Sequence, residues 1–266
     1  MKKILCGTLL ALSTSFAIAN TPAIDPVFAK VDTYLKANKF EDAYKELERL
    51  SKTGNGQATF NLAHLTKSGK GTASNPKKAI ELYELSGTQG YGLANYVLSQ
   101  VYASGSLGVA QNSAKATEYL DKAAKQGIEE AVVEQAVILF AENKPASDKQ
   151  ALSKLDPLIK KGDYSAIYAK AIYDMTVAGK TRDVALGNKA LESISTLAKK
   201  NYIPALLSVG NIYANGEIVQ QNLPEAKKIF SALAQQNVPT AKERLEAVNQ
   251  ALANQAKAPA TAPKKS

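Results

Sequence analysis

The feature that most constrains this chain is a pair of anchor residues that recurs six times. An alanine is followed eleven positions later by Gly or Asn, and a second alanine lies four positions further on. Gly and Asn tolerate the left-handed conformation that closes a helix, so each pair predicts a helix ending. The pairs are Ala43 with Gly54, Ala79 with Gly90, Ala116 with Gly127, Ala151 with Gly162, Ala190 with Asn201 and Ala226 with Asn237. The second alanines are Ala58, Ala94, Ala131, Ala166, Ala205 and Ala241.

Successive copies lie 35 to 39 residues apart, which is the length of two short helices and their loops. A helical hairpin of this size cannot bury its apolar face alone, so the hairpins must stack. The sequence therefore predicts an all-α solenoid of helix-turn-helix hairpins. The alanines are expected where neighbouring helices cross, because small side chains allow a close approach.

The clearest copy runs from Gly90 to Gly127. Its residues Ala94, Tyr96, Leu98, Ser99, Tyr102, Gly105, Gly108, Val109, Asn112, Ala116 and Gly127 resemble the Sel1-like repeat, which is related to the tetratricopeptide repeat. A second copy matches at Ala205, Leu207, Gly210, Tyr213, Gly216, Val219, Asn222 and Ala226, and a third at Ala58, Phe60, Leu62, Ala63, Gly69, Asn75 and Ala79. The resemblance covers roughly residues 25–252 and implies a right-handed superhelix that acts as a protein-binding adaptor.

Two units in the middle of the chain depart from this pattern. In the unit at Ala131, Glu142 stands where glycine is expected, and a short loop is predicted over residues 143–148. Pro157 is expected to kink or divide the helix that follows. The unit at Ala166 is expected to have a longer loop that includes Gly179, Arg182 and Gly187.

The two ends of the chain differ from the repeats. Residues 1–19 have a basic start, a short apolar segment and an Ala17-Ile18-Ala19 site, which are typical of a secretory signal peptide. We expect cleavage after Ala19 and export to the periplasm. Residues 253–266 are rich in Ala, Pro and Lys and are expected to be disordered. The predicted plan is a signal peptide (1–19), a repeat solenoid (25–252) and a tail (253–266).

Residues able to perform catalysis are scarce. His64 is the only histidine, and with Asn61 and Lys67 it is expected to lie on an exposed polar face. The only cysteine, Cys6, falls within the predicted signal peptide. We therefore predict no catalytic residue, cofactor or metal site.

The net charge of +9 comes without a dense basic segment, so nucleic acid is not an expected partner, while contact with anionic cell-wall polymer stays open. No segment after the signal peptide is apolar enough to span a membrane.

These observations lead to a functional expectation. The protein is expected to be a non-enzymatic periplasmic scaffold that binds a protein or peptide in an envelope complex, for example a secretion machine such as type VI or cell-wall machinery. The alternative is an enzyme or ligand-binding protein that acts on cell-wall fragments.

The binding surface is placed by analogy with tetratricopeptide solenoids, whose first helices line the concave side. Counting from the alanine of each first helix, the sixth and ninth positions are expected to point into this groove. The two middle copies present apolar residues there, flanked by amides, and the predicted partner-binding residues are Val137, Phe140, Ile172, Met175, Gln100 and Asn211. The competing interpretation is that the four apolar residues belong to the core.

Overall fold

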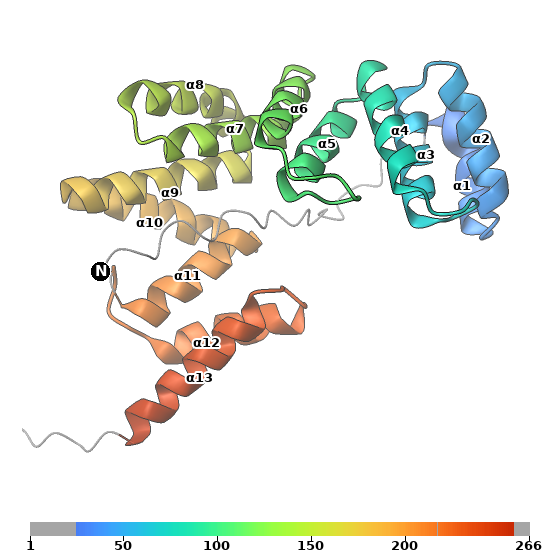
Figure 1. The fold of residues 1–266 in the computed structure, drawn as a ribbon. Helices are drawn as coiled ribbons and strands as arrows, with labels where there is room; N and C mark the ends of the chain where they lie inside the picture. Colours follow the sequence, from blue (N-terminus) through green and yellow to red (C-terminus); the bar gives the residue numbers. More distant parts are fainter. Residues whose placement is uncertain (1–24, 217, 258–266) are drawn as a thin grey trace, which may run out of the picture. The chain divides into compact units, whose positions relative to one another are not determined.

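The computed structural model describes residues 25–216 and 218–257, and in these ranges the chain is all-α (Figure 1). It forms thirteen α-helices and one short 3₁₀ helix, with no strand in the described ranges. The predicted all-α class is therefore confirmed. The expected signal peptide (1–19) and residues 258–266 lie outside the described residues.

The helices follow one another through short loops. They are η1 (Pro26–Phe28), α1 (Ala29–Lys36), α2 (Phe40–Lys52), α3 (Gly56–Ser68), α4 (Pro76–Thr88), α5 (Gly92–Ser104), α6 (Ser113–Lys125), α7 (Glu129–Ala141), α8 (Pro145–Lys161), α9 (Tyr164–Thr181), α10 (Val184–Lys199), α11 (Ile203–Asn215), α12 (Leu223–Gln235) and α13 (Ala241–Lys257). The last helix continues five residues past Leu252, where the solenoid was expected to end.

The helix boundaries follow the anchors that the sequence contains. All six closing residues have positive φ, from 57° at Asn237 to 88° at Gly90. The Asn112 side chain accepts a hydrogen bond from the Lys115 N–H at 3.0 Å, which caps the start of α6. Gly105 ends α5 in the left-handed conformation, with φ of 70°. The local signals therefore determine where the helices of each hairpin begin and end.

The described residues divide into two compact units at Lys154 and Leu155, within α8. In the N-terminal unit, which ends at Lys154, successive helices from α1 to α7 contact one another. Its core takes buried side chains from each of the first five α-helices, among them Val31, Leu47, Leu62, Tyr83 and Leu98.

The C-terminal unit begins at Leu155, and its helices α9 to α13 also pack in chain order. One cluster joins Ala171 of α9, Ile194 and Leu197 of α10, and Ala205 of α11. Another is built around Phe230 of α12 and reaches Val248 of α13. Both units are therefore stacks of hairpins, each with its own core.

Two loop expectations in the middle of the chain were wrong. The loop before α8 ends at Lys144 instead of extending to residue 148, because Asn143 takes the left-handed conformation that closes the turn. Pro157, expected to kink or divide its helix, does not divide α8, which continues to Lys161 with Leu155 and Leu158 buried on either side of the proline.

The second wrong expectation concerns the loop of the unit at Ala166. Gly179 lies inside α9 and Gly187 inside α10, so only Arg182 and Asp183 connect the two helices. Arg182 adopts the left-handed conformation, and the Asp183 side chain accepts a hydrogen bond from the Leu186 N–H at 3.0 Å. A non-glycine turn and an acidic cap thus replace the glycine loop.

A search of the described helices for membrane-spanning segments gives a negative result: none has the length and the apolar character that crossing a bilayer requires.

Candidate protein-interaction surface

The six predicted partner-binding residues all lie on first helices of hairpins, and all are half-buried. The N-terminal unit carries Gln100 on α5, and Val137 and Phe140 on α7. The C-terminal unit carries Ile172 and Met175 on α9, and Asn211 on α11.

The two amides make the same contact in their two units. Gln100 Nε2 donates to the Glu134 carboxylate of the next first helix, with distances of 2.9 Å to Oε2 and 3.2 Å to Oε1. Asn211 Oδ1 accepts a hydrogen bond from Arg244 Nη1, again on the next first helix. In both pairs the amide is the sixth residue from the repeat alanine, and its ionic partner is the third. The sixth position therefore joins consecutive first helices.

Sequence reasoning did not find Glu134 and Arg244. A sequence signal could have found them. Among the first helices, the third position is ionic only at Glu134 and Arg244. In both cases the sixth position of the preceding first helix, in the same unit, is an amide. The two pairs are equivalent in position and opposite in charge. Burial raises the pKa of the Tyr96 hydroxyl, and the neighbouring Glu134 carboxylate raises it further.

The four apolar residues are only partly covered by the cores. In the C-terminal unit, Ile172 and Met175 pack against the cluster of α9, α10 and α11 that contains Ile194. In the N-terminal unit, α7 (EEAVVEQAVILFA) is apolar on nearly every side. Beside the half-buried Val137, Ile138 leaves 47% of its surface exposed.

His64 lies in a different environment from the one predicted. It is half-buried, and its ring centroid lies 4.6 Å from that of Phe60 and 5.5 Å from that of Tyr83. The expected exposed polar face was therefore wrong, because α4 supplies an aromatic neighbour that the period of α3 does not reveal. Burial lowers the pKa of His64, and the charge of Lys67 adds to this effect.

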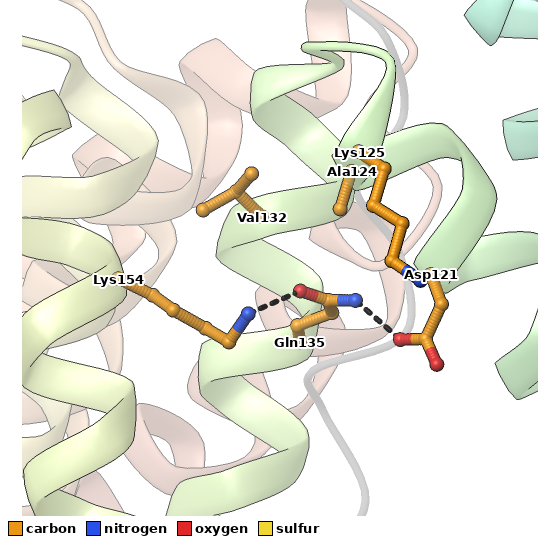
Figure 2. Close-up of a pocket in the computed structure, with 6 residues that line it drawn as sticks. All are labelled: Asp121, Ala124, Lys125, Val132, Gln135 and Lys154. Atoms are coloured by element: carbon orange, nitrogen blue, oxygen red, sulfur yellow. Dashed lines mark hydrogen bonds between the residues drawn. The ribbon is translucent and has the colours of Figure 1, made fainter.

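A depression of about 290 Å³ opens between α6, α7 and α8 in the N-terminal unit (Figure 2). Gln135 lies at its centre and donates from Nε2 to Asp121 Oδ1 at 2.5 Å, while its Oε1 accepts from Lys154 Nζ at 2.8 Å. Ala124, Lys125 and Val132 complete the lining. Val132 and Val137 lie five positions apart, which turns them to roughly opposite sides of α7. The depression and the predicted partner-binding row are thus on different faces.

No group of three or more His, Cys, Asp or Glu side chains in the described ranges could hold a metal ion.

Comparison with known proteins supports the repeat assignment. Three segments, residues 56–91, 92–128 and 203–238, match the family model described as the Sel1 repeat. They contain the hairpins α3–α4, α5–α6 and α11–α12, which are the three copies with the clearest motif in the sequence. In these three segments the chain is therefore similar to the Sel1 repeat. No curated protein matches the sequence.

Two solved structures share the fold. One is the Sel1 repeat protein from Oxalobacter formigenes, with a TM-score of 0.62 and 17% identity, over 85% of this chain and 98% of that one. The other is c5321, a protective antigen present in uropathogenic Escherichia coli strains that displays an SLR fold. The c5321 structure aligns with a TM-score of 0.59 and 21% identity over 89% of this chain. The chain spans only 56% of the length of c5321. These likenesses confirm the stacked-hairpin solenoid.

Proposed function

We propose that the protein is a non-enzymatic scaffold that binds a protein partner through the first helices of its Sel1-type hairpins. The observation that carries the proposal is the half-buried state of the sixth and ninth positions, which keeps side chains of neighbouring first helices accessible in rows. Stacked repeats of this kind typically act as protein-interaction surfaces. Half-exposed apolar side chains such as Val137 and Met175 supply contact area, and methionine adapts to varied partners.

The proposed location is the periplasm, after cleavage behind Ala19. The support is the sequence of residues 1–19, with its basic start, short apolar segment and Ala17-Ile18-Ala19 site. In this location the partner would belong to an envelope complex, such as a type VI secretion machine or cell-wall machinery. Mass spectrometry of the mature protein should find Asn20 at the amino terminus, with release by osmotic shock. An intact Met1 in the mature pool would contradict the proposed location.

Partner capture tests the binding surface. A photo-crosslinking amino acid placed at Ala103 or Ala214, both in the half-buried ninth row, should capture a protein in intact cells. The matched control positions are Glu118 on α6 and Lys228 on α12, which are exposed on second helices. Capture from the control positions alone would place the partner on the opposite face.

Charge substitution tests the apolar residues. Phe140→Glu and Met175→Glu, each made separately, should abolish capture and leave the helical melting transition nearly unchanged. If each variant unfolds instead, these side chains belong to the core and the partner does not contact them. Turnover of peptidoglycan fragments by the purified protein would contradict the scaffold proposal altogether.

A further inference from the structure

Arg244 is a half-buried cation without a neutralising acid among the described residues. Its Nη1 donates to Asn211 Oδ1, and its Nε is fully buried with no hydrogen-bond acceptor. No described carboxylate forms an ion pair with it, whereas Arg49 is paired with Glu46 at 2.7 Å. A guanidinium has five N–H donors, and leaving them without acceptors away from water costs stability.

The equivalent position in the N-terminal unit shows the difference. The Glu134 carboxylate receives two contacts from Gln100 and lies beside the Tyr96 hydroxyl, so donors of its own unit surround it. Arg244 has a single side-chain acceptor. The ionic side chain at this repeat position therefore has its hydrogen-bond partners within the N-terminal unit, whereas in the C-terminal unit it lacks some of them.

The surroundings of Arg244 are polar and come from three successive first helices. On α9 and α11, Tyr168 Oη and Ser208 Oγ share a hydrogen bond of 2.7 Å, and Asn211 lies one turn further along α11. Burial raises the pKa of Tyr168, while the Ser208 hydrogen bond and the Arg244 charge oppose that shift. Each of these side chains is half-buried, so the row remains accessible from solvent.

We propose that Arg244 and Asn211 form a carboxylate-binding point that receives an acidic peptide segment of the partner. This inference rests on the proposed function and narrows it, because it gives the chemistry of what binds to the C-terminal unit. A carboxylate fits the planar guanidinium through two parallel hydrogen bonds, and the Asn211 amide N–H₂ stays available as a further donor. One guanidinium with one amide suits a single carboxylate better than a dianion that needs several cations.

The probes are two labelled dodecapeptides, one with Glu at four positions and the other with Gln at the same four positions. Their binding to the protein is measured by fluorescence polarisation. The wild-type protein should bind the Glu peptide at least about tenfold more tightly, and added salt should reduce the difference. Arg244→Gln should abolish the preference. Lys242→Gln is the matched control, since it removes the same charge from an exposed position on the same helix. Equal binding of both peptides by the wild type, or an unchanged preference in Arg244→Gln, overturns the proposal.

The melting temperature separates binding from a structural role. Because Arg244 carries an unneutralised charge, Arg244→Gln should melt at the same temperature as the wild type or higher. A lower melting temperature together with lost preference would assign Arg244 to the fold and overturn the proposal.

NMR of the wild type needs no variant. The chain has only three arginines, so the Nε–H region of the spectrum should resolve Arg49, Arg182 and Arg244. The Glu peptide should shift the Arg244 signal and leave the other two unchanged, and inorganic phosphate should not reproduce the shift. A signal that phosphate moves equally, or that the peptide leaves in place, contradicts a carboxylate site. Crosslinking from Ala103 or Ala214 that persists in Arg244→Gln would preserve the scaffold proposal while this inference fails.

Discussion

At the scale of single residues, alanine determines how closely the hairpins stack. Five of the six repeat alanines in the second helices, and all six in the first helices, expose at most 1% of their surface. Ala116 is the exception and is only half-buried, on a helix that follows the longest Sel1-type loop of the N-terminal unit. Equivalent positions in the repeat are therefore not equivalent in packing.

This difference predicts unequal costs for the same substitution. Ala94→Leu should lower the free energy of unfolding by roughly 1–3 kcal/mol, because three added carbons have no space at a fully buried helix crossing. Ala116→Leu should cost less, since part of the new side chain can extend into solvent. Chemical denaturation of both variants compares the two costs. Equal losses would show that Ala116 is as tightly packed as Ala94.

His64 gives a pH dependence of known sign. Its pKa is lowered in the folded state, mainly by burial, so the folded protein binds the proton less readily than the unfolded chain does. Its contribution to stability is therefore complete above the ordinary histidine pKa and is lost as the pH falls through the folded value. Between about pH 8 and about pH 5, the wild type should lose more stability than His64→Gln. Parallel loss in the two proteins would mean that other groups cause the acid sensitivity.

At the scale of elements, a glutamine before the closing glycine ties the hairpins α3–α4 and α5–α6 each to the hairpin before it. Gln126 Nε2 donates to Gly87 O at 3.0 Å, and its Oε1 accepts from Asn95 Nδ2 at 2.6 Å. One repeat earlier, Gln89 makes the corresponding contacts to Ser51 O and Thr59 Oγ1. Gly87 is small for this reason, because a Cβ there would lie 2.5 Å from Asn95 Oδ1.

Removing this glutamine should loosen the stack. Gln126→Ala leaves the Asn95 amide, which is only 3% exposed, without its acceptor, and should cost about 1–3 kcal/mol. Gln236→Ala is the control, since Gln236 precedes a closing Asn but Leu206 stands where Asn95 stands in its own hairpin. That variant should stay within about 0.5 kcal/mol of the wild type. Thermal melts with an Asn95→Ala double-mutant cycle measure the coupling, and comparable losses in the two glutamine variants would refute this role.

The sequence predicted the elements well and their side-chain partners poorly. Helix ends depend on one residue and its neighbours, so Gly105 and Asn112 could be identified from local chemistry alone. The turn at Arg182 was missed because arginine, unlike glycine or asparagine, gives no sequence signal for the left-handed conformation. Contacts such as Asn211 with Arg244 join residues 33 positions apart, and the register between hairpins that creates them appears only in the structure.

At the scale of the whole molecule, the contacts divide the described hairpins into two compact units. The boundary falls within α8, in the part of the chain where the repeat is most degenerate. Contacts in a stack of hairpins are local, so damage in one hairpin should spread first to its neighbours in the same unit. We therefore expect that a substitution in one unit leaves the other unit nearly unperturbed.

One lesion in each unit tests this independence. Ala94→Leu should lower hydrogen-exchange protection across residues 25–154 and leave residues 155–257 nearly unchanged. Gly210→Ala should do the reverse, because a Cβ at Gly210 would lie 2.7 Å from the buried Phe230 ring and force α11 away from α12. Gly179→Ala is the matched control: it is also a helical glycine, but no atom lies within 4 Å of its added Cβ, so higher helix propensity should keep or raise protection there. If either lesion reduces protection equally along both ranges, the chain unfolds as one cooperative body, and the boundary in α8 marks a change in contact density without a change in stability.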